Sequence, residues 1–151
     1  CMGGAAHPEM HPSSTGWEDE MRHARGKVDA GCEFLITQLF FDNQDYFRYV
    51  ERAREVGIRV PIVPGIMPVG SVPGIKRMAA MNRNRIPDDF LAELEAVTDD
   101  DAAVHAIGVR YATDQCAELL ERGVPGIHFY TLNKSPATRE ILTALRDRLS
   151  P

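Results

Sequence analysis

Hydrophobic positions along the chain follow two different spacings. Apolar residues that recur every three or four positions are typical of one face of a helix. This spacing predicts helices over residues 17–30, 42–56, 75–83, 87–97, 101–122 and 136–148. Compact apolar runs lie between them and predict strands at residues 33–38, 59–63 and 126–131, while the small residues 3–6 fit a further strand. The alternation of strand and helix predicts an α/β fold with a parallel sheet.

Polar and glycine residues mark where the predicted helices begin and end. Thr15 is placed to cap the first helix, Asp42 or Asn43 the second, and the aspartates at 99–101 the long fifth helix. A glycine follows several of the predicted helices, which is typical of helix ends; these glycines are Gly31, Gly57 and Gly123. The dipeptide Pro64–Gly65 is expected to bound the third strand.

Composition narrows the class of protein. The chain has 151 residues, of which 44% are hydrophobic and 26% charged, with a net charge of -5, as in one soluble globular domain. No basic stripe indicates nucleic-acid binding, and no apolar run approaches the roughly 20 residues of a membrane span. Without a signal-peptide pattern, we expect a cytoplasmic protein. The three cysteines, Cys1, Cys32 and Cys116, are too far apart for a CxxC motif and are read as reduced thiols.

Six segments together resemble one enzyme family. Four strands by themselves fit either a small open sheet or half of a closed barrel. The order and spacing of the segments, however, resemble the C-terminal half of the catalytic domain of methylenetetrahydrofolate reductases. The segments are HPEMHP (7–12), GKVDAG (26–31), ITQLFFD (36–42), PIVPGIMPV (61–69), RIPDDF (85–90) and GIHFYTLNKS (126–135).

The resemblance implies a partial TIM (β/α)8 barrel. Residues 1–151 would form the C-terminal half of a FAD-binding reductase domain, roughly strands five to eight with their helices. The first residue is Cys1 rather than methionine, and we expect the chain to begin partway through a longer protein. The family uses NAD(P)H to reduce FAD, which then reduces 5,10-methylenetetrahydrofolate to 5-methyltetrahydrofolate. Its general acid lies on the first strand, so we expect no catalytic residue in this chain and no turnover by it alone.

The loop that follows the first strand is the first candidate site. His7, Glu9 and His11 match a family loop that lines FAD, although the family often has tyrosine where this chain has His7. The same three side chains admit two other interpretations, a metal site and a solvated loop. Pro8 and Pro12 oppose the helical spacing of an HExxH metal site, so we predict cofactor binding and no metal.

The first helix carries the second candidate site. Glu20, His23 and Lys27 are spaced three and four residues apart and would share one side of the helix. By itself this pattern is typical of a solvated surface. The resemblance implies that Lys27 neutralises a phosphate of FAD, that Glu20 replaces an aspartate which reaches a cofactor hydroxyl, and that His23 lies beside them.

The folate site is expected at the ends of two strands. Gln38 closes an apolar strand, and its amide both donates and accepts hydrogen bonds, which suits a pterin edge. Alternatively it caps the following loop. The resemblance implies that Tyr130 and Lys134 also contact folate, with Lys134 meeting the glutamate carboxylates of its tail.

Two rival functions remain open at this point. A half-barrel exposes unpaired strand edges, so the chain could be an interaction module that pairs with the missing N-terminal half or with a second copy as a homo-oligomer. An unrelated small α/β enzyme is the other rival. Because the family uses no GxGxxG motif, the sequence does not distinguish NADH from NADPH.

Overall fold

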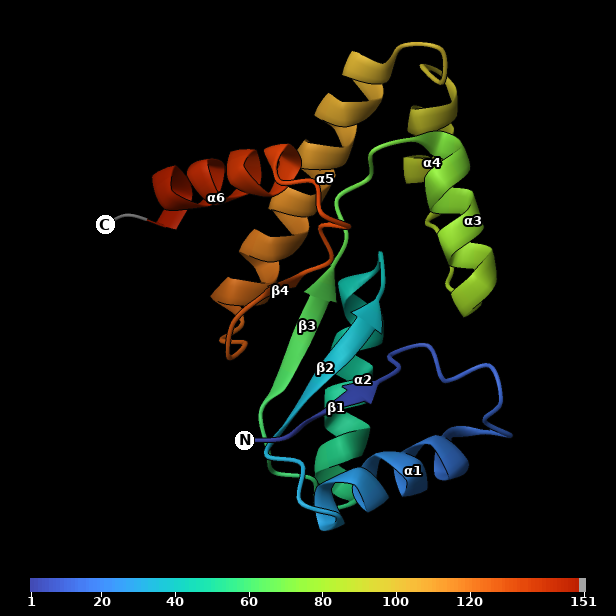
Figure 1. Ribbon diagram of the computed structural model, residues 1–151, viewed down its shortest axis with the longest axis vertical. Coiled ribbons are helices and arrows are strands. Elements are labelled where there is room, and N and C mark those ends of the chain that lie inside the picture. The colour runs from blue at the N-terminus through green and yellow to red at the C-terminus, as the bar shows by residue number, and fades with distance from the viewer. Residues whose placement is uncertain (150–151) are drawn as a thin grey trace.

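The computed structural model describes residues 1–149, with the side chains of residues 1–146. Four strands and six helices follow one another along this part of the chain (Figure 1). The elements are β1 (Gly3–Ala6), α1 (Trp17–Asp29), β2 (Phe34–Leu39), α2 (Asn43–Glu55), β3 (Ile62–Ile66), α3 (Val72–Asn82), α4 (Asp88–Glu95), α5 (Asp101–Glu121), β4 (His128–Phe129) and α6 (Pro136–Leu149).

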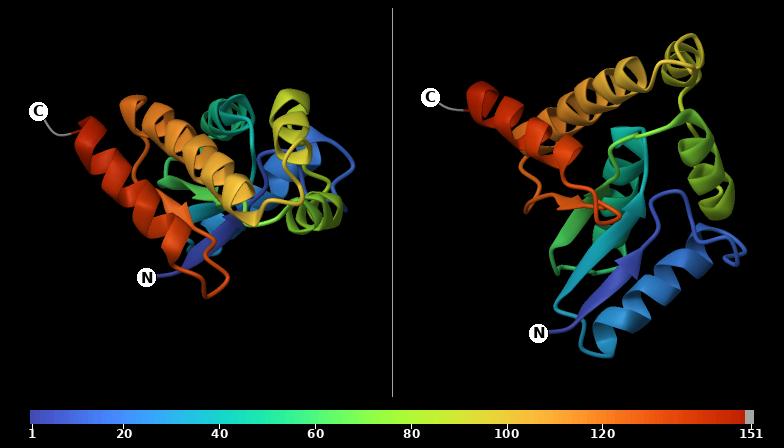
Figure 2. Two further views of the ribbon diagram at one scale, coloured as in Figure 1. Left: turned by 90° about the horizontal axis from the view of Figure 1, so that it is seen from above. Right: turned by 45° about the horizontal axis from the view of Figure 1, so that its top comes forward.

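The sheet is parallel and its strands lie in chain order, β1-β2-β3-β4. Crossovers between parallel strands are right-handed, so a sheet built in sequential order places its connecting helices on one face. Figure 2 shows the helices following one side of the curved sheet. A doubly wound sheet would have helices on both faces. The arrangement is therefore that of a segment of a (β/α)8 barrel, in agreement with the predicted α/β class.

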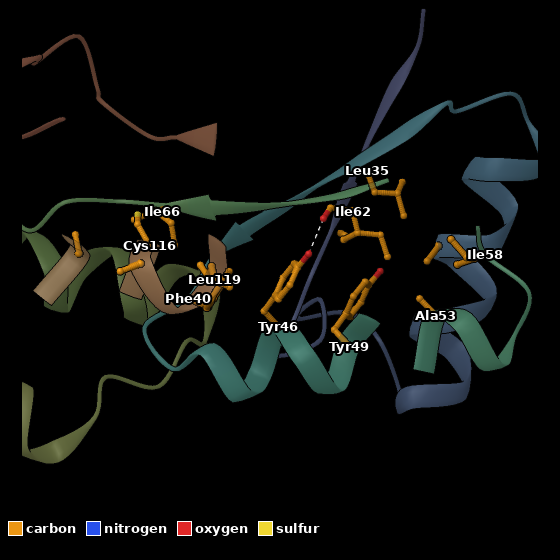
Figure 3. Close-up of a cluster of buried hydrophobic side chains, with 14 of the residues drawn as sticks. Leu35, Phe40, Tyr46, Tyr49, Ala53, Ile58, Ile62, Ile66, Cys116 and Leu119 are labelled. Atoms are coloured by element: carbon orange, nitrogen blue, oxygen red, sulfur yellow. Dashed lines mark hydrogen bonds between the residues drawn. The ribbon is translucent and has the colours of Figure 1, made fainter. Parts of the chain in front are cut away.

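The hydrophobic core lies between the sheet and its helices. Along β2, Leu35, Thr37 and Leu39 are buried toward the helices, whereas the alternate residues are only half-buried on the opposite face. Helix α2 presents Tyr46 and Tyr49 to this core (Figure 3). Each large apolar side chain buried here contributes roughly 1.5–3 kcal/mol. The buried face fixes the register of the strands and, with it, where their C-terminal ends lie.

The third strand differs from the prediction. It spans Ile62–Ile66 rather than residues 59–63, so Pro64 and Gly65 lie inside the strand instead of bounding it. The ladder between β2 and β3 is irregular at this point, and an irregular ladder tolerates a residue without an N–H group. The sequence pattern predicts a turn at Pro64 and Gly65, whereas in the structure these two residues mark a distorted strand.

Gly65 is required by the close approach of two neighbours. Its N–H group donates to the Thr37 hydroxyl at 2.8 Å. A Cβ atom at this position would lie 2.3 Å from the Thr37 carbonyl oxygen and 2.6 Å from the ring of Tyr130. These contacts bring the ends of β2, β3 and β4 together.

Other boundaries confirm or correct the sequence predictions. Asp42 caps α2 and Asp100 caps α5, as predicted. Thr15, however, does not cap α1: the N-cap residue is Gly16, and Thr15 donates to the Asp19 carboxylate instead. Strand β4 is only two residues long, rather than the six predicted, because its pairing with β3 covers only two positions.

Candidate functional site

The candidate site lies at the C-terminal ends of the four parallel strands. Two loops at this end carry most of the predicted site residues. They are the first loop, residues 7–16 after β1, and the last loop, residues 130–135 after β4. Ligand sites of (β/α) barrels lie at this end of the sheet, since the loops after the strands converge there.

Glu20 is the polar anchor of the first loop. Its side chain reaches back from α1 and is almost completely buried, with the residue 2% exposed. Its Oε2 atom accepts hydrogen bonds from the His11 backbone N–H at 2.9 Å and from the Ser14 hydroxyl at 2.7 Å, and its Oε1 atom lies 3.7 Å from His7 Nδ1. Burial alone would raise the pKa of Glu20, but these donors outweigh it and lower the pKa to about 2. Glu20 is therefore a buried carboxylate that stays ionised.

The three polar residues of α1 do not form one continuous surface. Glu20 is buried under the first loop, so a solvated stripe is the wrong interpretation for it. His23 has a side chain that is 56% exposed and lies 3.6 Å from Asp19. Lys27 turns toward β1, where its Nζ atom donates to the Ala5 carbonyl oxygen at 2.6 Å. Of the three, Glu20 and Lys27 lie against the end of β1, and His23 faces solvent.

Glu9 points away from the histidines that flank it. Its two carboxylate oxygens accept from the Asn84 side-chain amide at 2.6 Å and from the Arg85 backbone N–H at 2.7 Å. Burial raises the pKa of Glu9, and the two hydrogen bonds only partly offset that effect. His7 and His11 instead pack edge to face, with ring centroids 4.7 Å apart. Among the side chains of residues 1–146, no three His, Cys, Asp or Glu residues are grouped to hold a metal ion.

Gln38 contacts the end of α3. Its Nε2 atom donates to Asn82 Oδ1 at 2.9 Å, and its Oε1 atom accepts from the Leu39 N–H at 3.0 Å. The Asn82 amide is itself held by a hydrogen bond to the Met78 carbonyl. Gln38 therefore sits at the strand end, as predicted, with its amide oriented by a partner that the sequence pattern did not reveal.

The last loop borders a cavity of about 850 Å³. The cavity lies between this loop and the segment after β3, and its lining includes Tyr130, Lys134, Met67, Arg77 and His105. Tyr130 donates its hydroxyl to the Thr37 carbonyl at 2.8 Å, and burial raises the pKa of that hydroxyl. Tyr130 and Lys134, which the sequence predicts to contact folate, thus line the same cavity.

The structure brings the predicted residues together in two groups. Glu20 and Lys27 lie at the first loop, whereas Tyr130 and Lys134 line the cavity. Sequence reasoning missed the partners that hold Glu20, Gln38 and Glu9. They are Ser14 for Glu20, Asn82 for Gln38, and Asn84 and Arg85 for Glu9. The segment RIPDDF, which begins at Arg85, is one of the six segments that resemble the family. Its sequence does not indicate that the Arg85 N–H group contacts Glu9, 76 residues away.

Fold and site together define a class of protein. A sequential parallel sheet with helices on one face, and polar side chains gathered at the C-terminal ends of its strands, is consistent with part of a (β/α) barrel. The sequence model of the methylenetetrahydrofolate reductase family matches residues 1–146. The chain belongs to this family.

Curated relatives and a solved structure agree with this assignment. The chain is 37% identical to methylenetetrahydrofolate reductase (NADH) 1 of Arabidopsis thaliana, over 93% of this chain and 25% of that protein. It is 39% identical to a probable methylenetetrahydrofolate reductase (NADPH) of Caenorhabditis elegans, over 95% and 22%. Its identity to the 5,10-methylenetetrahydrofolate reductase of Escherichia coli is 38%, over 93% and 48%. The chain thus spans about half the length of the bacterial relative and a quarter or less of the other two.

The structural likeness concerns the fold. A solved structure described as an uncharacterized protein from Clostridium thermocellum that binds two copies of 5-methyl-5,6,7,8-tetrahydrofolic acid superposes with a TM-score of 0.58 at 20% identity, covering 97% of this chain and 52% of that one. None of the helices in the described part of the chain is long and apolar enough to cross a membrane.

Proposed function

We propose that this chain supplies part of the FAD site and part of the folate site of a methylenetetrahydrofolate reductase. The reaction is the reduction of 5,10-methylenetetrahydrofolate to 5-methyltetrahydrofolate with NAD(P)H. The observation that carries the proposal is the gathering of Glu20, Lys27, Gln38, Tyr130 and Lys134 at one end of the sheet, in a chain that belongs to this family. Residues 1–151 then correspond to the C-terminal half of a (β/α)8 reductase domain, strands five to eight.

The residues around the first loop fit a phosphate-bearing cofactor such as FAD. Lys27 holds one carbonyl oxygen, and an ammonium group has three donors, so it can also neutralise a phosphate. Glu20 is ionised, and the resemblance implies that it meets a ribose or adenosine hydroxyl in addition to the first-loop donors that it already holds. His7 Nδ1 is buried and faces Glu20 Oε1 at 3.7 Å, so His7 would meet the cofactor through the rest of its ring, and His11 and His23 lie nearby along the same loop and helix. When bound, FAD supplies the hydride transfer.

The residues around the cavity fit folate. The Gln38 amide, which Asn82 holds at the end of β2, would meet the pterin edge, and Tyr130 lines the cavity itself. Lys134 is exposed on the cavity wall and makes no side-chain ion pair among the described residues, so its charge is available to the carboxylates of the folate tail. The Clostridium thermocellum protein, which is described as binding 5-methyl-5,6,7,8-tetrahydrofolic acid, supports this choice of ligand.

The nicotinamide donor and the catalytic acid complete the proposal. The relatives are named for NADH in one case and NADPH in another, so the donor is written NAD(P)H. The resemblance implies that the general acid of the reaction lies on the first strand of the complete barrel. We therefore propose that the acid comes from the other half of the domain and that these residues alone do not turn over substrate.

Flavin binding tests the proposal directly. FAD is titrated into the chain alone and into the chain combined with the unmatched half of the Escherichia coli relative, and flavin fluorescence is followed. We expect saturable quenching in the combination, weakened about tenfold by Lys27→Ala, the size expected when a charge-assisted hydrogen bond is lost. Arg22→Ala, which removes an exposed cation of the same helix, is the matched control and should leave the affinity unchanged.

Two outcomes would contradict the proposal. Absence of quenching in the combination would exclude an FAD site built from these residues. Stable self-association of the chain with no flavin affinity would favour the alternative function, a half-barrel interaction module. That alternative draws on the outer edges of β1 and β4, which pair with no other strand within the described sheet.

A further inference from the structure

The end of α3 and the residues that follow it contact the first loop and both ends of the connection between β2 and α2. We call residues 82–85 the bracket. Figures 1 and 2 both show the end of α3 beside the first loop. The bracket reaches the first loop through Glu9 and through the Pro12 carbonyl, which accepts from Arg83 at 3.0 Å. It also reaches the end of β2 through Gln38, and the start of α2 through Asp42, which accepts from the Arg85 guanidinium at 2.7 Å.

We propose that Glu9 is a positioning residue that fixes the cofactor loop to the bracket, and that the bracket couples this loop to the folate-binding amide of Gln38. Glu9 acts through Asn84 and Arg85 and does not touch the cofactor. The proposal rests on the proposed function, because it names what the two coupled groups bind.

Glu9 is suited to this role by its chemistry. A carboxylate offers two acceptor oxygens, and both are used, one by the Asn84 side chain and one by the Arg85 backbone. An amide in its place would direct an NH₂ group at one of these two donors. The exchange of Glu9 for glutamine therefore replaces two charge-assisted hydrogen bonds by neutral ones, and the one to Asn84 forms only if that amide turns its unpartnered Oδ1 atom toward the glutamine. The size of the side chain stays the same.

The bracket is rigid because a helix end defines it. Arg83 ends α3 in the left-handed conformation, with φ at 56°. The N–H groups of Arg83 and Asn84 donate to the Ala80 and Ala79 carbonyls, which closes the helix. This geometry presents the Asn84 side chain and the Arg85 N–H together to one carboxylate. A shift of the first loop is therefore passed to the end of α3.

The same helix end orients Gln38. Asn82 donates from Nδ2 to the Met78 carbonyl, which leaves its Oδ1 atom to accept from Gln38. The Gln38 amide is thereby held in one of its two possible orientations. The path from cofactor loop to substrate residue runs from Glu9 to Asn84 and Arg85, along two residues of backbone to Asn82, and across one hydrogen bond to Gln38.

Amide hydrogen exchange tests the first link without any ligand. The chain is compared with Glu9→Gln, with Asn84→Ala and with the double variant. Glu18→Gln, which changes an exposed glutamate of α1, is the matched control. We expect the Arg85 amide to lose protection in Glu9→Gln and to keep it in the control. Unchanged protection of Arg85 in Glu9→Gln would overturn the proposal.

Binding measurements test the coupling. FAD and 5-methyltetrahydrofolate are titrated separately and together into the chain combined with the Escherichia coli half. In Glu9→Gln, FAD affinity should fall about tenfold, and the factor by which each ligand changes the affinity of the other should move toward one, since coupling between two sites is reciprocal. A loss that is purely structural would lower both affinities and leave this factor unchanged, which would refute the proposal.

The double variant separates direct from indirect action. If Glu9 acts through Asn84, the effects of Glu9→Gln and Asn84→Ala on FAD affinity should not add. Additive effects would mean that Glu9 meets the cofactor itself and would overturn the proposal. If the wild-type combination binds no FAD, the proposed function fails, whereas the exchange of the Arg85 amide still decides whether Glu9 holds the bracket.

Discussion

The first and last loops lie at the same end of the sheet, but they are held in opposite ways. The first loop is held by the carboxylates of Glu9 and of Glu20 from α1, each of which accepts hydrogen bonds from two donors. In the last loop, Leu132 and Asn133 adopt left-handed backbone conformations and are exposed, and the loop borders an open cavity. The first loop is thus held in place by hydrogen bonds without any ligand. The last loop is exposed, and we expect it to move at a lower cost in stability. Mutations should therefore affect stability at the first loop and ligand binding at the last.

Removal of the Glu20 carboxylate should have the largest effect on stability. Glu20→Ala leaves the His11 N–H and the Ser14 hydroxyl without their acceptor in a partly buried loop. We expect the free energy of unfolding to fall by about 3 kcal/mol, measured by urea denaturation. Glu18→Ala, an exposed neighbour, should change it by less than about 0.5 kcal/mol. A comparable loss in both variants would remove the distinction between the loops.

Low pH should remove the stabilisation of the fold that the Glu20 carboxylate provides. The pKa of Glu20 is lowered from 4.5 to about 2 in the folded chain. A carboxyl group with a lowered pKa stabilises the fold above its unfolded pKa and loses that effect as the pH falls toward the folded pKa. The stability difference between wild type and Glu20→Gln should therefore shrink between about pH 4.5 and pH 2. A difference that stays constant across this window would mean that the Glu20 charge is not what holds the loop.

Tyr130→Phe should have an intermediate effect. The variant loses the hydrogen bond to the Thr37 carbonyl but keeps the ring against Gly65. We expect a loss of about 1 kcal/mol in the free energy of unfolding. Tyr111→Phe is a matched control, since it removes a similar bond to the Phe41 carbonyl outside the last loop. Tyr111→Phe should lose about as much, and a much smaller loss in Tyr130→Phe would show that this bond does not anchor the start of the last loop.

Lys134→Ala should have the smallest effect on stability and a clear effect on ligand. The side chain is exposed at the cavity, so unfolding should change by less than about 0.5 kcal/mol. Affinity for 5-methyltetrahydrofolate, measured by calorimetry, should fall about tenfold if a charge-assisted hydrogen bond is lost. A destabilisation of more than about 1 kcal/mol would show that the last loop is held more tightly than the exposed position of Lys134 implies.

Helices and strands were predicted correctly wherever the local pattern of apolar and polar residues matched the tertiary environment. The six helices and the strand β2 lie within a few residues of their predicted positions, since one-sided burial imposes a period that the sequence must keep. The prediction for β3 was wrong because Pro64 and Gly65 are turn residues by propensity. Only the approach of Thr37 and Tyr130, both distant in sequence, makes them part of a strand.

The sequence named the residues of the candidate site better than it predicted how their side chains are arranged. The resemblance named Glu9, Glu20, Lys27, Gln38 and Lys134, and their roles toward ligands remain predictions. It did not indicate that Glu20 would be buried, that Lys27 would hold the Ala5 carbonyl, or that Glu9 would face Asn84 rather than the histidines. Side-chain direction depends on which partner the fold brings near, and the partner of Glu9 lies 75 residues away.

The sequence by itself determined the class, the family and the order of strands and helices, because these depend on periodic burial and on runs of residues that are local along the chain. Tertiary structure decided which side chains became anchors and which stayed available to a ligand. The physical reason is that a hydrogen bond between Glu9 and Arg85, or between Gln38 and Asn82, forms only after the parallel sheet has brought its C-terminal ends together.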